Sequence, residues 1–382
     1  MLKNKLFFFL ILTLCFSSAV SAQTIQAASV IHNVHKINSS VLGEERTVLV
    51  CVPAGYARAD EKFPVVYMLN AHPPQNAMMA GIIEQQAWAG QMPEMILVGI
   101  QNTNRTRDLT PTKTERPDSG GGDKFLEFIE KEVIPLVEKN YRTQPFRIFA
   151  GHSFGGLTAV YAFVSRPDLF NAYVAASPVL HWDKNFVIKR AEEIFNRNQD
   201  WKKTMFLAVG DEPDYSDGFN KFQDLLKKAK PKNFTYEFQQ FKNENHGSVV
   251  LPAYYAGLRK IFAGWTPPAG SVADLENHYE KLSEKFGYQI KIPEDMLNQI
   301  GYQLLGARRT REAVEVFNKN VENYPKSANV YDSLAEAYEK NGQMKQSKEN
   351  YEKAYKMAEK QGNAELAKTA KANFERISAK LK

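Results

Sequence analysis

A serine flanked by glycines lies between an apolar run and an amphipathic stretch, and this turn constrains the fold more than any other feature. The segment Gly151-His152-Ser153-Phe154-Gly155-Gly156 follows a predicted strand at 146–150 and precedes a predicted helix at 157–165. A strand–serine–helix turn is very tight, and side chains two residues before or after the serine would clash with the neighbouring chain. The motif therefore predicts that Ser153 is a nucleophile raised above a sheet edge, beside a helix N-terminus.

The chain around this turn alternates strand and helix signals up to about residue 265. Short runs rich in Val, Ile, Tyr and Phe are bounded by turn residues, which is typical of strands. Amphipathic stretches such as 124–140 and 157–165 separate them. This alternation predicts an α/β fold with a mostly parallel central sheet covered on both faces. The predicted strands are 47–52, 65–69, 95–100, 147–150, 173–175, 205–209 and 235–241.

Serine is a weak nucleophile and needs a base, which an acid in turn orients. His246 directly follows the predicted strand 235–241 and precedes the last helix of the domain, so it is the predicted base. The acid is expected in the loop after the strand 205–209. That loop offers several carboxylates, and sequence position leaves Glu212 and Asp214 as alternatives.

An oxyanion hole needs two backbone donors. The N–H of Phe154 is one predicted donor, and the loop after the strand 65–69 is expected to supply the other, at Ala71. His72 in the same loop is either a pocket residue or a surface histidine. Because no cluster of His, Cys and carboxylates has metal-ligand spacing, we expect no metal and no cofactor.

The N-terminus indicates export. Two lysines precede an apolar run of 11 residues, Leu6–Phe16, which is too short to span a bilayer, and Val20-Ser21-Ala22 suits cleavage. We therefore expect a signal peptide at 1–22, a periplasmic or secreted protein, and no membrane span in the mature chain. The formal charge of +6, with no concentrated basic run, argues against nucleic acid as a partner.

The sequence pattern changes after Thr266-Pro267-Pro268-Ala269-Gly270-Ser271. This segment predicts a linker at 266–271. Beyond it the chain is helical and charged, with a self-similarity of 34 residues that aligns Gly301 with Ala335 and Phe317 with Tyr351. This pattern resembles tetratricopeptide repeats, and an ordinary helical bundle is the alternative. We expect a hydrolase domain at 23–265 and an all-α repeat domain at 272–382 that binds a protein partner or self-associates.

Residues of about 44–265 resemble the esterase D and enterochelin esterase-like family of α/β-hydrolases. The resemblance rests on the serine turn together with five other segments, which are Phe63–Leu69, Met92–Ile100, Asn102–Pro111, Ser177–Trp182 and Val209–Pro213. It implies an α/β-hydrolase fold and cleavage of carboxylic esters, with a siderophore trilactone or a polysaccharide-linked ester as substrate.

The resemblance also assigns residues. It favours Glu212 as the acid, and it implies that Arg105 or Arg107 contacts the substrate and that Trp182 lines the pocket. A structural ion pair with Asp108 is the alternative for both arginines. The family often has Asp-Gly-acid in the oxyanion loop, where this chain has Asn70-Ala71-His72.

Three functions remain open at this stage. The first is a serine esterase that forms an acyl-enzyme on Ser153, with His246 as general base. The second is an acyltransferase that uses the same triad with an alcohol acceptor. The third is a catalytically silent binding protein that works through its repeats.

Overall fold

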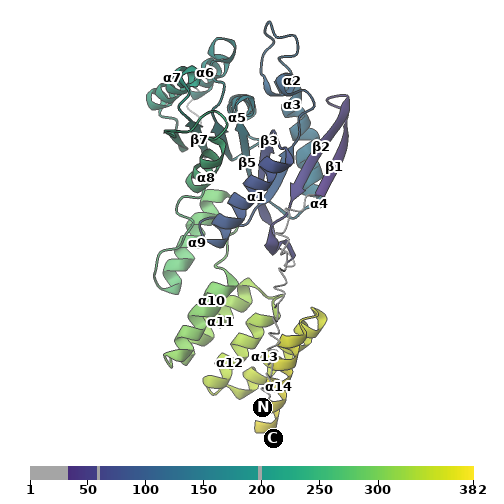
Figure 1. Ribbon diagram of the computed structural model, residues 1–382. Coiled ribbons are helices and arrows are strands. Elements are labelled where there is room, and N and C mark those ends of the chain that lie inside the picture. The colour runs from purple at the N-terminus through teal and green to yellow at the C-terminus, as the bar shows by residue number, and fades with distance from the viewer. Residues whose placement is uncertain (1–32, 58–60, 197–199) are drawn as a thin grey trace, which may run out of the picture.

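A computed structural model describes residues 33–57, 61–196 and 200–382. The predicted signal peptide, residues 1–22, lies outside this part of the chain. Figure 1 shows a sheet with helices on both faces at one end of the molecule and a stack of helices at the other. The first part corresponds to the segment in which strand signals alternate with helices, and the second to the segment in which strand signals end.

The central sheet has eight strands in the order β1-β2-β4-β3-β5-β6-β7-β8. β1 and β2 form an antiparallel hairpin at one edge, and β2 pairs antiparallel with β4. The pairs from β4 through β3 to β8 are all parallel. The sheet confirms the predicted α/β-hydrolase fold. Its strands are β1 (Asn33–Ser39), β2 (Glu44–Cys51), β3 (Phe63–Leu69), β4 (Ile96–Ile100), β5 (Thr143–His152), β6 (Ala172–Ala176), β7 (Lys203–Val209) and β8 (Phe234–Gln240).

Helices cover both faces of this sheet, so the central strands are apolar throughout. All seven residues of β3 are buried. Neighbouring residues of a strand point to opposite faces, and accordingly Tyr67 belongs to one hydrophobic core and Met68 to the other. The elements of this part are η1 (Ala54–Ala57), α1 (Pro73–Trp88), α2 (Arg105–Leu109), α3 (Gly122–Phe128), η2 (Ile129–Val133), α4 (Ile134–Asn140), α5 (Phe154–Ser165), α6 (Trp182–Phe195), α7 (Pro213–Ala229) and α8 (Val250–Ile261).

Six helices follow the Pro-Pro segment. They are α9 (Val272–Phe286), α10 (Glu294–Gly306), α11 (Thr310–Asn323), α12 (Ala328–Lys340), α13 (Met344–Lys360) and α14 (Ala364–Lys380). The first of them, α9, packs against the sheet part of the molecule. The ring of Phe286 lies 5.0 Å from that of Phe146 on β5 and 5.1 Å from that of Phe262, which follows α8. One hydrophobic core therefore continues from the sheet through α8 into α9 and α10.

The helices α10 to α13 repeat one contact. A Cβ at Gly301 would lie 2.4 Å from the ring of Phe317, so the two helices approach too closely there for a larger side chain. Ala335 and Tyr351 occupy the equivalent places and share one buried cluster. Contacts thus recur at the predicted spacing of 34 residues, while membership of the tetratricopeptide family stays a prediction.

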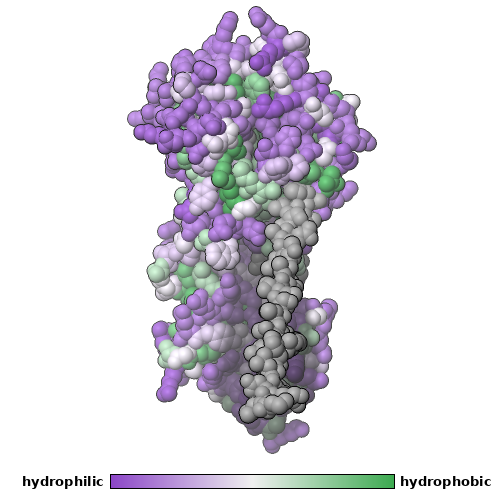
Figure 2. Space-filling view, in the orientation of Figure 1, coloured by the Kyte–Doolittle hydropathy of each residue, from purple (hydrophilic) through white to green (hydrophobic). Residues whose placement is uncertain are grey.

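The visible surface is mainly hydrophilic over both parts of the molecule (Figure 2). Large apolar side chains that are exposed include Trp88 at the end of α1 and Leu251 on α8. Among the described residues, no helix combines the length and the apolar character needed to cross a bilayer.

Candidate active site

Ser153 occupies the turn between β5 and α5 with φ 61° and ψ −118°. A non-glycine residue at positive φ is strained, and such strain clusters at functional sites. The hydrogen bond from Ser153 N to Ala176 O, at 2.9 Å, joins this turn to the end of the neighbouring strand β6. A Cβ on Gly151 would lie 2.2 Å from the carbonyl oxygen of Gly155, so this turn requires glycine at position 151. The sequence folds here as the motif predicts.

His246 and Glu212 meet beside this turn. The Nδ1 atom of His246 lies 2.5 Å from Oε2 of Glu212. The carboxylate is 7% exposed, and its other oxygen accepts hydrogen bonds from Ser177 Oγ at 2.5 Å and from Gly210 N at 3.0 Å. Asp214, the alternative acid, is exposed on the first turn of α7. The structure therefore brings Glu212, and not Asp214, to the imidazole.

A backbone hydrogen bond connects the loop after β7 with the loop after β8, and this explains why Glu212 and His246 lie next to each other. Asp211 N donates to the carbonyl of Glu244 at 2.7 Å. A Cβ on Gly210 would lie 2.3 Å from that same carbonyl oxygen, so only glycine allows the approach. Two residues later the chain reaches His246. Ser177 and Gly210 could not be predicted from the sequence as partners of the acid, because their contact depends on the spatial order of the strands.

Two further aromatic residues surround the imidazole, and the sequence analysis gave neither of them a role. The ring of Tyr215 stacks on that of His246, with centroids 4.6 Å apart, and its hydroxyl lies 3.5 Å from Nε2. The side chain of Ser153 is close enough to this hydroxyl to lower the pKa of Tyr215. The ring of His152 lies 4.5 Å from that of His246. Burial lowers the pKa of His152 to about 4, so its imidazole is neutral at ordinary pH.

Arg105 and Trp182 flank the residue after the nucleophile. The guanidinium of Arg105 lies 5.1 Å from the ring centroid of Phe154, and its Nε donates to Asn70 Oδ1 at 3.3 Å. Burial lowers the pKa of Arg105. Trp182 packs edge-on against Phe154 at 5.4 Å and is 8% exposed. Both residues thus lie beside the residue that follows the nucleophile, and their contact with the substrate stays a prediction.

Arg107 lies in an ion-pair network instead. Its guanidinium donates to Glu44 Oε1 at 2.6 Å and, through Nε, to Asp108 Oδ1 at 2.9 Å. The hydrogen bond from Arg107 lowers the pKa of Glu44 to about 2. Asp108 also accepts from Arg46 at 2.8 Å, and both of these side chains are buried. The structural alternative therefore holds for Arg107, which anchors the segment that carries Arg105.

The oxyanion loop differs from the expectation. The N–H of Ala71 donates to the carbonyl of Ile100 at 3.3 Å, so it is already engaged and the choice of Ala71 as a donor is not supported. His72 is exposed at the start of α1, which fits the surface alternative. Phe154 begins α5, and the first N–H groups of a helix have no intrahelical acceptor. Its N–H remains the candidate oxyanion donor.

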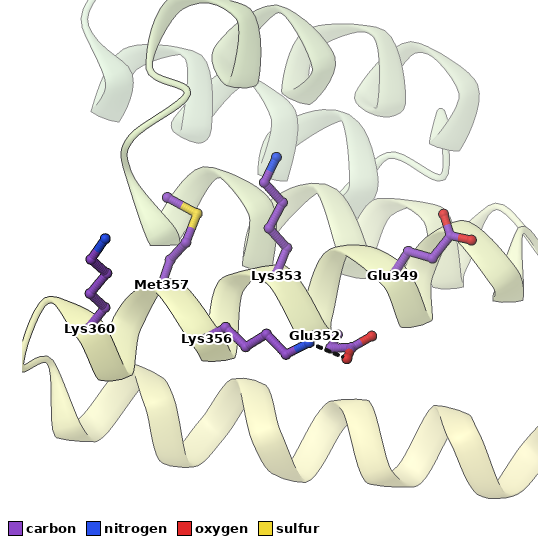
Figure 3. Close-up of a pocket in the computed structure, with 6 residues that line it drawn as sticks. All are labelled: Glu349, Glu352, Lys353, Lys356, Met357 and Lys360. Atoms are coloured by element: carbon purple, nitrogen blue, oxygen red, sulfur yellow. Dashed lines mark hydrogen bonds and ion pairs between the residues drawn. The ribbon is translucent and has the colours of Figure 1, made fainter.

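A separate shallow hollow lies on α13 of the C-terminal helices (Figure 3). Its lining is mostly charged, and Lys356 pairs with Glu352 at 2.6 Å. All of its lining residues come from one helix, so it is distinct from the catalytic cluster. They are Glu349, Glu352, Lys353, Lys356, Met357 and Lys360.

A family model described as "Putative esterase" matches residues 39–259, which is more than half of the chain. The chain belongs to this family. It is 29% identical over 240 residues to the ferri-bacillibactin esterase BesA of Bacillus subtilis, an alignment that covers 54% of this chain and 79% of that protein. The predicted resemblance to the enterochelin esterase-like family is confirmed.

Solved structures extend the similarity. An IroE-like serine hydrolase from Shewanella oneidensis is 30% identical, with a TM-score of 0.69 over 76% of this chain and 99% of that one. An uncharacterised protein from Capnocytophaga ochracea is 18% identical, with a TM-score of 0.63 over 91% of this chain and 100% of that one. The second match shows only that the fold, including most of the C-terminal helices, recurs. Together with the family match, these relatives identify the chain as a carboxylic ester hydrolase of the serine type.

Proposed function

We propose that this esterase works through an acyl-enzyme on Ser153, with His246 as general base and Glu212 as the acid that orients it. One observation supports the proposal most strongly. The pair His246–Glu212, 2.5 Å apart, lies at the sheet edge that also carries the strained Ser153. This arrangement fits the roles of nucleophile, base and orienting acid.

The steps follow from these roles. Ser153 Oγ attacks the ester carbonyl carbon while its proton passes to Nε2 of His246. Glu212 accepts the Nδ1 proton as a hydrogen bond, which fixes the tautomer and stabilises the imidazolium. The N–H of Phe154 stabilises the oxyanion. The C–O bond to the alcohol then breaks, the alcohol takes the proton from Nε2, and water repeats the sequence on the acyl-enzyme to release the acid.

The substrate that we propose is a siderophore ester. One relative is named a ferri-bacillibactin esterase and matches over 79% of its length. Two cationic groups lie near the residue after the nucleophile, because Arg116 is 6.0 Å and Arg105 is 5.1 Å from the ring centroid of Phe154. Cations beside the acyl site favour a substrate that carries negative charge. Trp182 supplies an apolar wall next to them.

The termini fit this use. We propose that residues 1–22 direct export, which would place the enzyme where an exported siderophore complex is met. The helices α10 to α14 carry no residue of the catalytic cluster. We propose that they bind a protein partner or a second copy of the chain.

A fluorophosphonate probe tests the mechanism without knowledge of the substrate. The wild-type protein should be labelled on one serine, and Ser153→Ala should lose both labelling and hydrolysis of p-nitrophenyl esters by a factor on the order of 10^4 or more. Ser347→Ala is a matched control, because Ser347 is a fully buried serine on α13, outside the catalytic cluster, and this variant should still be labelled on Ser153. Retention of a tenth of the activity in Ser153→Ala would contradict the assignment.

The substrate class needs its own comparison. Hydrolysis of a catecholate trilactone siderophore, with and without iron, is measured beside hydrolysis of a feruloyl polysaccharide ester. Faster turnover of the trilactone supports the proposal. Turnover of the polysaccharide ester alone would replace the substrate and leave the mechanism standing.

A further inference from the structure

Tyr215 lies in the middle of the catalytic cluster. It is in the first turn of α7, three residues after Glu212. Its hydroxyl lies 3.5 Å from Nε2 of His246, and the side chain of Ser153 is close enough to lower the pKa of this hydroxyl. These are the two atoms between which the catalytic proton moves, so the phenol touches reacting groups.

The leaving oxygen of an ester must come to this same place. When Ser153 is acylated, the alcohol oxygen departs from the carbon that Oγ has just attacked, and it takes its proton from Nε2. An oxygen in that position lies close to Oγ and to Nε2. The hydroxyl of Tyr215 already lies near both atoms in the structure.

We propose that Tyr215 is a catalytic residue that donates a hydrogen bond to the leaving-group oxygen during acylation. This inference rests on the proposed function of Ser153 and His246. The phenol oxygen stays in place, and only its O–H bond rotates toward the alcohol oxygen as the tetrahedral intermediate collapses. The C–O bond breaks, its electron pair stays on the alcohol oxygen, and the proton comes from Nε2 of His246. Tyr215 keeps its own proton throughout.

The surroundings of Tyr215 suit a donor that stays protonated. Burial raises the pKa of Tyr215, the hydrogen bond with Ser153 opposes that shift, and the nearby Glu212 adds to it. The phenol is therefore neutral at ordinary pH. Its ring stacks on His246 at 4.6 Å and packs edge-on against His181 at 5.7 Å, so the direction of the hydroxyl is fixed.

A purely structural role is the competing explanation. The stacking of the two rings alone would hold the imidazole in place. Tyr215→Phe separates the two roles, because it keeps the ring and removes only the hydroxyl. A lost donor to the leaving oxygen should matter most when the alcohol is a poor leaving group, whereas a misplaced imidazole should slow all esters alike.

The experiment measures kcat/KM for acetate esters whose alcohols run from p-nitrophenol to simple alkanols. The proteins are the wild type, Tyr215→Phe and, as the control, Tyr255→Phe, whose residue is 47% exposed on α8. For Tyr215→Phe we expect a loss on the order of 10- to 100-fold with alkyl esters and a loss below about threefold with the p-nitrophenyl ester. Tyr255→Phe should match the wild type with every ester.

The remaining outcomes each overturn the inference. An equal loss with all esters would make Tyr215 a positioning residue, and unchanged rates would leave the hydroxyl without a role. Higher rates would show that the hydroxyl obstructs Ser153. The fluorophosphonate probe separates the proposal for Tyr215 from the proposal for the triad. Labelling of Ser153 in Tyr215→Phe shows an intact nucleophile, however the loss of kcat/KM varies with the alcohol of the ester. The proposed triad is tested by Ser153→Ala, whose result does not depend on the role of Tyr215.

Discussion

The packing of α9 predicts that the catalytic part of the chain does not end at the Pro-Pro segment. Phe286, at the end of α9, is 3% exposed and lies against Phe146 and Phe262. Replacing a buried Phe by Ala costs about 3–5 kcal/mol. At about 2–4 °C per kcal/mol for a unit of this size, Phe286→Ala should lower the midpoint of thermal inactivation by about 6–20 °C.

Phe317→Ala is the matched control. Phe317 is fully buried, but it packs within the repeat helices, in a cluster separate from the core that contains Phe286. The assay is esterase activity on a small ester after heating, alongside circular dichroism for helix content. Phe317→Ala should lower the melting temperature of the C-terminal helices and leave the midpoint of thermal inactivation nearly unchanged. Equal inactivation midpoints for the two variants would refute the reasoning.

Truncation tests the same boundary more severely. A chain that ends near Pro268 loses four buried side chains of α9, each worth roughly 1.5–3 kcal/mol of burial, and exposes their partners. The sum, about 6–12 kcal/mol, is as large as the whole stability of a typical domain. We therefore expect that chain to be insoluble, whereas one that ends at about residue 308, after α10, keeps the side chains that α9 and α10 contribute to this core and should hydrolyse small esters. The four side chains are Leu275, Tyr279, Leu282 and Phe286.

The other predictions concern the site. Glu212→Gln should lose far more activity than Asp214→Asn, on the order of 10^2-fold or more, because Glu212 alone of the two contacts His246; the reverse order in a kcat/KM comparison would exchange the two acids. His152 should make the protein less stable in acid, since its pKa is lowered from 6.5 to about 4 by burial. Between those pH values the unfolded chain binds a proton that the folded chain does not, so stability falls as pH falls through that window. His152→Gln should weaken the pH dependence of the urea unfolding midpoint over that range. An unchanged pH dependence would assign the acid sensitivity to another group.

Much of the fold was predictable because periodic patterns are local. The predicted strands 65–69 and 205–209 lie within the observed β3 and β7, whose ends extend them by two residues. The serine turn was equally local, since its glycines and flanking elements are contiguous. The domain boundary was harder. The apolar face of α9 looks the same in sequence whether it packs on other helices or on the sheet part of the molecule.

The site was predictable only in part, because its remaining features depend on long-range contacts. Arg105 and Arg107 are indistinguishable by position, and Glu44 on β2 separates them by pairing with Arg107. Ala71 suits an oxyanion donor until the carbonyl of Ile100 engages its N–H. Tyr215 had a local signal that went unused, as it lies one helical turn after the acid.

The order of the strands explains how these residues meet. Ser153, Ser177, Glu212 and His246 follow β5, β6, β7 and β8, which are neighbours in the sheet and parallel. Ligand sites in such sheets lie beyond the carboxyl ends of the strands. At about 4.8 Å per strand, β8 is roughly 14 Å from β5, too far for a hydrogen bond between the first turns beyond them. The loop after β8 must therefore lean back across β7, and the bond from Asp211 N to Glu244 O fixes it there. The acid loop thus has two tasks, since it orients the imidazole through Glu212 and brings it toward the nucleophile through Gly210 and Asp211.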